Sequence, residues 1–257
     1  MAKLPRLKSV PDGLIHCPIT PFTPDNEVDT DVFVKIVEFL LKQDAGALCV
    51  NLHLAESLNL TQEERKLLAK LCIEVADGRA PVIVNVATPG TDLAINLARQ
   101  AEEDGADCIM TIAPYYWKPP EDGIYEHYKE ISEKSNIPII MYNVPSRTGS
   151  NINTDTVIKL ANDCDNIIGI KEASGNIEQI MQIINNNGQV VLGSNDINLI
   201  VANSPQKCTD STSFLYNNVQ MRHCFEWERV NKLESGYYLI NLIMDNNVLL
   251  QETIKLK

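Results

Sequence analysis

Short apolar segments alternate with amphipathic segments along most of the chain. Several apolar segments, such as PIIMYN and NIIGIK, have almost no polar positions, which is typical of strands buried on both faces of a parallel sheet. The predicted strands are Leu14–Cys17, Gly46–Asn51, Pro81–Ala87, Asp107–Ile112, Pro138–Asn143, Asn166–Lys171 and Gln189–Gly193. Each of these segments except the last is followed by a stretch with helical spacing of apolar residues.

The helical stretches carry start and stop signals. Thr61 and Glu64 form a capping-box pattern ahead of RKLLAKLCIEVA, and Gly105 follows TDLAINLARQAEED as a helix stop. Helices are also predicted over residues 29–44, 120–135, 154–163 and 176–187. Repeated strand–helix units indicate a parallel α/β fold, and their even spacing favours a closed TIM (β/α)8 barrel over an open sheet.

The region after Gly193 departs from this pattern. Cys208–Leu215 is the candidate eighth strand, but its CTDSTSFL sequence is polar for a buried strand, so this strand is poorly defined. The tail, which includes LESGYYLINLIMDNN, is predicted to form one or two helices. The predicted organisation is a barrel domain over residues 1–217 and a C-terminal helical appendage over residues 218–257.

Composition excludes several classes of function. The 257 residues carry a formal net charge of −12, which argues against nucleic acid or an anionic membrane as the main partner. The sequence has no apolar run long enough for a membrane span, and MAKLPRLKSVPDG lacks the apolar core of a signal peptide. The 7 cysteines form no C-x-x-C motif, a pattern that suits a reducing compartment. The chain is therefore expected to be a cytoplasmic globular protein.

Lys171 is the most reactive candidate, because chemistry in such barrels lies at the C-terminal ends of the strands. It ends the apolar run NIIGIK, where a low dielectric disfavours the ammonium form. A neutral amine can attack a ketone and form a Schiff base, which acts as an electron sink for C–C chemistry. On position alone, the commoner interpretation is an ordinary strand-end lysine followed by Glu172, a solvated charge at a helix start.

Tyr142 and Arg147 follow the preceding strand. The Tyr142 hydroxyl can donate and accept the protons that carbinolamine formation and dehydration require, although a tyrosine packed in a barrel is the more common case. Arg147 lies in a turn with Pro145 and Gly149 that can aim its guanidinium at a carboxylate. A surface arginine in a loop is an equally good interpretation from position alone.

Two motifs, YNVPSRTG (Tyr142 to Gly149) and GIKEASGN (Gly169 to Asn176), resemble the signature pair of the dihydrodipicolinate synthase / N-acetylneuraminate lyase family. The segments CPITPF and APYYWKP and the ES-LT-EER pattern are also similar to that family, and the resemblance covers roughly residues 12–200. It implies a class I aldolase on a TIM barrel with a helical C-terminal region. Members of the family are usually homotetramers and need no metal or other cofactor.

The resemblance also implies a role for each matching residue. Lys171 would form the Schiff base with pyruvate or a related 2-oxo acid, and Tyr142 would be the general acid and base. Arg147 would bind a second carboxylate, as in the synthases of the family. Tyr116 would reach across a dimer interface into the neighbouring proton relay, unless it serves interface packing alone. Gly193 would line the pocket.

The segment Leu52–Glu56 departs from the family, whose Gly-Thr/Ser-Thr-Gly-Glu loop holds the pyruvate carboxylate. Both hydroxyls and both glycines are replaced, and because Leu52 and Ala55 tolerate positive φ poorly, we expect the turn to be altered. His53 stands at the position of the relay hydroxyl, where it either passes protons or is an ordinary loop histidine. Leu54, with Leu52, would make the pocket less polar.

Three hypotheses follow from these residues. The leading one is a Schiff-base-forming lyase that cleaves or condenses a 2-oxo acid with an aldehyde. Its sibling uses the same Schiff base to dehydrate or decarboxylate a 2-oxo sugar acid. The rival is a non-catalytic barrel that binds a 2-oxo acid or a partner protein. The altered loop disfavours a dihydrodipicolinate synthase, and the absence of a glycine-rich loop after a late strand disfavours a phosphate-binding barrel.

Overall fold

The computed structural model describes residues 7–186, 188 and 190–192, and it describes the backbone of four later strands. The chain divides into two compact units, Met1–Leu192 and Gly193–Lys257. The boundary predicted at residue 217 remains a prediction, because residues 193–211 and 217–218 lie outside the described residues.

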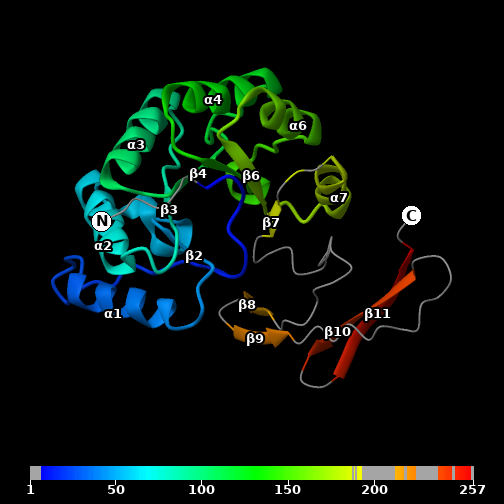
Figure 1. The fold of residues 1–257 in the computed structure, drawn as a ribbon, viewed down its shortest axis with the longest axis horizontal. Coiled ribbons are helices and arrows are strands. Elements are labelled where there is room, and N and C mark those ends of the chain that lie inside the picture. Colours follow the sequence, from blue (N-terminus) through cyan, green and yellow to red (C-terminus); the bar gives the residue numbers. More distant parts are fainter. Residues whose placement is uncertain are drawn as a thin grey trace. The chain divides into compact units, whose positions relative to one another are not determined.

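The first unit is built on a curled parallel sheet of seven strands in the order β1 to β7, with each strand beside its neighbour in sequence (Figure 1). All the strands predicted for this unit are confirmed, with most ends one or two residues shorter. This order is that of a (β/α)8 barrel, so the predicted α/β barrel class is also confirmed. The strands are β1 Ile15–His16, β2 Ala47–Val50, β3 Val82–Asn85, β4 Cys108–Ile112, β5 Ile139–Asn143, β6 Ile167–Glu172 and β7 Val190–Leu192.

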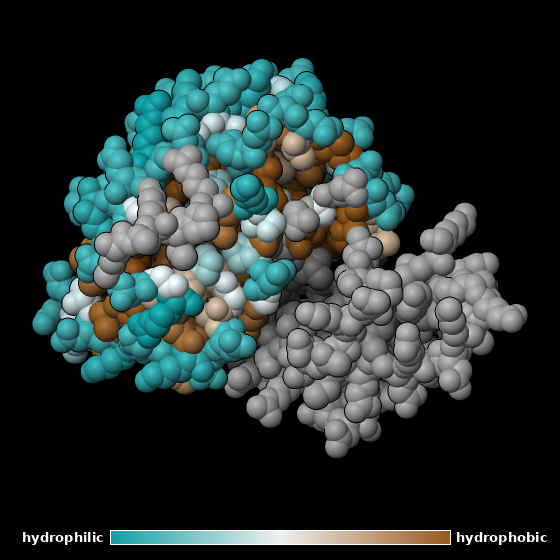
Figure 2. Space-filling model, in the orientation of Figure 1, coloured by the Kyte–Doolittle hydropathy of each residue, from teal (hydrophilic) through white to brown (hydrophobic). Residues whose placement is uncertain are grey.

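The helices predicted for the first unit are confirmed and lie along the outer side of the sheet, where Figure 2 shows a mainly hydrophilic rim. A short helix, α5, and two 3-10 turns, η1 and η2, occupy connections at the C-terminal ends of strands. The helices and turns are α1 Thr30–Leu41, η1 His53–Ala55, η2 Ser57–Asn59, α2 Gln62–Ala76, α3 Thr91–Asp104, α4 Glu121–Lys134, α5 Pro145–Thr148, α6 Thr154–Asp163 and α7 Ile177–Asn185.

Buried side chains form two layers, one on each face of the sheet. Val82 and Val84 of β3 pack toward the helices, whereas Ile83 packs in the barrel interior. The same alternation in β5 places Met141 in the helix layer and Tyr142 in the interior. The alternation of strand side chains therefore decides which residues can reach the centre of the barrel.

The predicted capping box begins α2. The Thr61 hydroxyl accepts a hydrogen bond from the Glu64 backbone N–H at 3.2 Å, and the Glu64 carboxylate accepts one from the Thr61 N–H at 2.7 Å. These two bonds satisfy N–H groups that have no partner within the helix.

We expect Thr61→Ala to lower the free energy of unfolding by about 1 kcal/mol, because a helix N-cap contributes roughly that amount. Chemical denaturation of both proteins measures the difference. Gln62→Ala, an exposed change in the first turn of the same helix, is the matched control. Equal stability of Thr61→Ala and the wild type would contradict the assignment of the cap.

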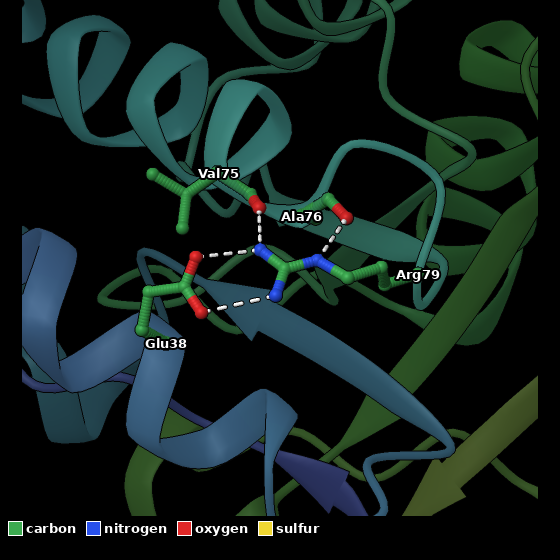
Figure 3. Close-up of polar contacts among 4 residues, drawn as sticks. All are labelled: Glu38, Val75, Ala76 and Arg79. Atoms are coloured by element: carbon green, nitrogen blue, oxygen red, sulfur yellow. Dashed lines mark hydrogen bonds and ion pairs between the residues drawn. The ribbon is translucent and has the colours of Figure 1, made fainter.

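Arg79 connects the end of α2 to α1 (Figure 3). Its guanidinium donates to both oxygens of Glu38, at 2.6 and 3.0 Å, and to the carbonyl oxygen of Val75. Its Nε donates to the carbonyl oxygen of Ala76 at 3.3 Å. Because α2 ends with free carbonyl groups, a cation at this position both caps the helix and fixes its neighbour.

The described segments of the second unit are strands, so the prediction of helices over residues 218–257 is wrong for these segments. β8 (Thr212–Tyr216) pairs antiparallel with β9 (Val219–His223), and β10 (Tyr237–Met244) pairs antiparallel with β11 (Asn247–Lys255). The YYLINLIM sequence of β10 is rich in aromatic and β-branched residues, which favour a strand over a helix.

The predicted eighth strand is only partly described. β8 overlaps Cys208–Leu215, and its described partner is the antiparallel β9. Cys208–Ser211 and Gly193 lie outside the described residues.

Among the helices of the described residues, none is long and apolar enough to cross a membrane.

Candidate active site

Lys171 and Tyr142 lie side by side at the C-terminal ends of β6 and β5. The two residues are register partners, and Lys171 Nζ is 4.3 Å from the centroid of the Tyr142 ring. Tyr142 is 5% exposed and belongs to the interior cluster. The structure thus brings the two residues of the predicted Schiff-base chemistry together in the barrel.

A bulge in β6 directs Lys171 into the barrel. The register between β5 and β6 shifts after Ile139, where Ile168 is an extra residue in β6. An extra residue reverses the alternation of the side chains that follow it. Without it, Ile170 would face the interior in place of Lys171. The irregularity is therefore part of what builds the site.

His53 lies beside this pair, in the η1 turn that follows β2. Its ring centroid is 6.3 Å from that of Tyr142. Burial lowers the pKa of His53 to about 4, and the positive charges of Lys171 and Arg147 act in the same direction. Its buried Nδ1 has no hydrogen-bond partner within the described part of the chain. His53 is therefore a neutral imidazole at pH 7, with one ring nitrogen able to accept a hydrogen bond and the other able to donate one.

We expect this pKa to make stability depend on pH. The pKa of His53 is lower in the folded state than the ordinary value of 6.5, so its contribution to stability is present above pH 6.5. This contribution is lost as the pH falls towards 4. Because the ring is only partly buried, the expected loss is roughly 1–2 kcal/mol.

Urea denaturation of the wild type and His53→Gln between pH 7.5 and 4 measures this loss. The difference in unfolding free energy between the two proteins should shift in favour of His53→Gln as the pH falls. A difference that stays constant over this range would mean that the imidazole is not desolvated in the folded protein.

The Leu52–Glu56 segment contains the η1 turn, and whether this turn differs from that of the family remains a prediction. Positive φ falls on Asn51 (60°) and Glu56 (54°), and neither Leu52 nor Ala55 adopts it. Asparagine is among the residues that tolerate this conformation best. The Thr20 hydroxyl donates to the Ala55 carbonyl oxygen at 2.8 Å and fixes the loop to the segment after β1.

The two leucines of this loop have different environments. Leu52 is 1% exposed and packs in the interior cluster that contains Tyr142, whereas Leu54 is 51% exposed. Only Leu52 therefore makes the interior less polar. The N–H groups of His53 and Leu54 open the η1 turn, where a 3-10 helix leaves its first N–H groups without internal partners.

Arg147 and Tyr116 are both exposed. Arg147 lies on α5, which has Pro145 in its first turn and ends at Gly149 with a φ of 70°. Tyr116 is 85% exposed, has a φ of 75° and packs edge to face on Trp117. Its reach into a neighbouring subunit remains a prediction, and so does the role of Gly193, which is outside the described residues.

Two cysteines in the barrel interior were not predicted as site residues. Cys17, after β1, and Cys49, on β2, are hydrogen-bonded to each other. This bond lowers the pKa of Cys17, and together with burial it raises that of Cys49. Lys171 lowers the pKa of both thiols, so they lie within its electrostatic reach. The C-terminal ends of neighbouring strands were the available signal for finding them.

Asn85 was also missed, although it ends β3 just as Lys171 lies at the end of β6. Its Nδ2 donates to the Asn51 carbonyl oxygen at 2.7 Å. The Asn51 side chain in turn donates to the Arg65 carbonyl oxygen at 2.8 Å. These two bonds hold the left-handed residue from which the His53 loop begins.

Glu172 is fully buried, so its interpretation as a solvated charge at a helix start is wrong. Its carboxylate accepts hydrogen bonds from Asn143 Nδ2 at 2.9 and 3.1 Å, from Gln179 Nε2 at 2.9 Å and from the Ser174 N–H at 2.9 Å. Glu172 follows Lys171 in a strand, so it faces the helices while Lys171 faces the interior.

The described residues contain no group of three His, Cys, Asp or Glu side chains suited to a metal.

Comparison with known proteins gives a consistent result. The model of the dihydrodipicolinate synthetase family matches residues 10–224. A 4-hydroxy-tetrahydrodipicolinate synthase of Phocaeicola vulgatus is 41% identical over 182 residues, which cover 70% of this chain and 61% of the relative. One of Campylobacter jejuni is 34% identical over 246 residues, which cover 92% of this chain and 82% of the relative.

Solved structures agree in fold. Dihydrodipicolinate synthase from Aquifex aeolicus has a TM-score of 0.68 at 38% identity, covering 70% of this chain and 62% of that structure. The Acinetobacter baumannii enzyme, crystallised in complex with pyruvate, has a TM-score of 0.68 at 35% identity, covering 71% and 63%. The chain thus spans about 60% of the length of several relatives that it matches.

Proposed function

Because this chain belongs to the dihydrodipicolinate synthetase family, we propose that it is a Schiff-base-forming lyase of the class I aldolase type. Its substrates are pyruvate or a related 2-oxo acid, together with an aldehyde. The observation that carries the proposal is the register pair of Lys171 and Tyr142, with Nζ 4.3 Å from the ring centroid. The pyruvate bound to the relative from Acinetobacter baumannii supports the choice of 2-oxo acid.

The proposed reaction begins with the neutral amine of Lys171. It attacks the C2 carbonyl carbon, and the oxygen takes a proton to give a carbinolamine. The Tyr142 hydroxyl supplies the proton that lets this oxygen leave as water, and an iminium remains on Nζ. Loss of a C3 proton then gives an enamine, which adds to the aldehyde. Hydrolysis of the resulting iminium releases the product and restores the amine.

His53 and the η1 turn have supporting roles in this proposal. A neutral imidazole near Tyr142 takes the hydroxyl proton at one ring nitrogen as it gives up its own proton from the other, which replaces the hydroxyl relay of the family. The N–H groups of His53 and Leu54 bind the substrate carboxylate, because the start of a helical turn presents donors to an anion. Leu52 limits the water around C3 through its packing beside Tyr142.

Arg147 is proposed to bind an acidic group on the second substrate. We expect Arg147→Ala to raise the KM for an aldehyde that carries a carboxylate by about 10- to 100-fold, because a charged hydrogen bond contributes about 1.5–3 kcal/mol. Steady-state kinetics with acidic and neutral aldehydes measures the effect. Arg99→Ala, which removes an exposed arginine on α3, is the control. Equal KM changes for both aldehydes would contradict the role.

Trapping tests the proposed function. The protein is incubated with pyruvate, reduced with borohydride and digested, and the adduct is mapped by mass spectrometry. We expect one reduced pyruvyl group on Lys171. No adduct on folded protein, either with pyruvate or with larger 2-oxo acids, would overturn the aldolase proposal and favour a non-catalytic binding barrel.

A second candidate reaction uses the same Schiff base to dehydrate or decarboxylate a 2-oxo sugar acid. The substituted loop favours it, since Leu52–Glu56 lacks both hydroxyls of the family. Product analysis after incubation with sugar acids separates the two reactions.

We also propose that the protein is a homo-oligomer, a dimer or tetramer, and that it is located in the cytoplasm. The exposed Tyr116 and Trp117 support the oligomer, and the 7 cysteines without a C-x-x-C motif support a reducing compartment such as the cytoplasm.

A further inference from the structure

The pair Asn143–Glu172 stands directly behind the pair Tyr142–Lys171. β5 and β6 are in register at both positions, so Asn143 is opposite Glu172 just as Tyr142 is opposite Lys171. Successive residues of a strand point to opposite faces. Two cross-strand pairs therefore share one stretch of backbone, one facing the interior and the other facing the helices.

Asn143 and Glu172, the pair that faces the helices, are hydrogen-bonded to each other and buried. Asn143 is 1% exposed and Glu172 is 0% exposed. The Asn143 amide reaches both carboxylate oxygens, at 2.9 and 3.1 Å, and its own oxygen accepts a hydrogen bond from the Ile152 N–H at 3.0 Å. Every polar atom of the Asn143 side chain is thereby bonded, which leaves its amide a single orientation.

The carboxylate is held from two further directions. Gln179 Nε2, from the first turn of α7, donates to one oxygen at 2.9 Å, and the Ser174 N–H donates to the other at 2.9 Å. Asn151 connects to Asn143 and to Gln179, at 2.9 and 3.0 Å. The β6 strand end is thus fixed to β5, to α7 and to the chain that follows it.

The side-chain bonds between Asn143 and Glu172 lie where the backbone hydrogen bonds between β5 and β6 end. The last hydrogen bond between the two strand ends is the one from the Ala173 N–H to the Asn143 carbonyl oxygen, at 2.9 Å. Just before that bond, the side chains of Asn143 and Glu172 join the same two strand ends. A small displacement of a reacting group can lower a rate by about a hundredfold. Tyr142 and Lys171 are the pair just before Asn143 and Glu172, so side-chain bonds that keep the two strand ends together also limit displacement of Lys171 relative to Tyr142.

We propose that Glu172 and Asn143 are positioning residues that hold Lys171 and Tyr142 at the distance and orientation that Schiff-base formation requires. This inference rests on the proposed function, because it assigns these residues to the same reaction. Neither residue touches the substrate. Their effect is transmitted through the two strand ends that they join.

Glu172→Gln tests the proposal, since it keeps the volume of the side chain but loses a charged acceptor of these donors. The readout is the rate at which borohydride-trapped pyruvate accumulates on Lys171, measured against pyruvate concentration and corrected for the folded fraction by circular dichroism. We expect the saturating rate to fall by about 10- to 100-fold, with the half-saturating concentration changed by less than about threefold. A purely structural role would change only the folded fraction.

Gln179→Met is the second variant. It removes one donor to the same carboxylate and puts an apolar side chain of similar length in place of the amide. We expect a smaller fall in the saturating rate, by about 3- to 10-fold. Glu178→Gln, an exposed change on the same helix, is the matched control and should behave as the wild type.

The outcomes separate the two proposals. A wild type without an adduct would overturn the proposed function and this inference together. An adduct in the wild type that forms at the same saturating rate in folded Glu172→Gln and Gln179→Met would overturn only the positioning role. A variant that changes only the half-saturating concentration, with the saturating rate unaltered, would also overturn it, because the carboxylate would then serve binding.

Discussion

Lys171→Met is expected to abolish the trapped pyruvate adduct and to lower turnover by at least about a thousandfold. The reason is chemical, since methionine has no nucleophile and no other group can form the covalent intermediate at that position. Mass spectrometry after borohydride reduction, together with an assay of aldol cleavage and condensation, measures both effects. The variant should fold, because an unbranched apolar side chain replaces the lysine stem in the interior.

Two controls make this result specific. Lys66→Met removes an exposed lysine from α2 and should keep both the adduct and the activity. Lys171→Arg keeps a positive charge beside the Tyr142 ring but forms no Schiff base, so it should be as inactive as Lys171→Met. Retained turnover in either Lys171 variant would show that the reaction does not proceed through an imine on this residue.

The strands and helices of the first unit could be predicted because each signal is local. Apolar runs mark the strands, the Thr61–Glu64 box starts α2, and Gly105 ends α3 with a φ of 97°. The rule that reactive groups lie at strand ends then selected Lys171 and Tyr142. Their contact also depends on the bulge at Ile168, and in the uniformly apolar run NIIGIK no pattern reveals which residues face inward.

The environment of Glu172 and the form of the tail could not be predicted for different reasons. A carboxylate that follows a strand is usually solvated. Glu172 is buried because Asn143 and Gln179, which are distant in sequence, lie close to it in the fold and donate hydrogen bonds to it. In the tail, LINLIM has apolar residues at both helical and strand spacing, so periodicity alone does not decide. Its β-branched and aromatic residues were the better signal.

The left-handed positions of the His53 loop avoid Leu52 and Ala55, the residues that stand where the family resemblance places glycines. Loss of glycine matters only where φ is positive, and those positions fall on Asn51 and Glu56. The backbone that presents the N–H groups of His53 and Leu54 therefore needs no positive φ at Leu52 or Ala55. What the substitutions remove is the pair of hydroxyls that the family resemblance places in this loop.

Tyr142→Phe is expected to lower the rate of Schiff-base formation by about 10²- to 10⁴-fold, which is the usual contribution of a positioned general acid and base. The ring remains in the interior cluster beside Lys171, so binding of pyruvate and folding should change little. The adduct should therefore still form on Lys171, but slowly, and single-turnover trapping over time measures this rate directly.

The pH dependence distinguishes this role from packing. In the wild type, neutral His53 stands near Tyr142 and can share its proton, so the rate should fall as the pH drops towards the pKa of about 4. The ratio of the wild-type rate to the Tyr142→Phe rate should therefore fall as the pH drops towards 4, because any loss of neutral amine lowers both rates alike. Tyr125→Phe, which removes the hydroxyl that donates to Asp163 at 2.7 Å on the surface, is the control and should keep the wild-type profile. A Tyr142→Phe variant that forms the adduct at the wild-type rate would assign proton transfer to another group, with His53 the next residue to replace.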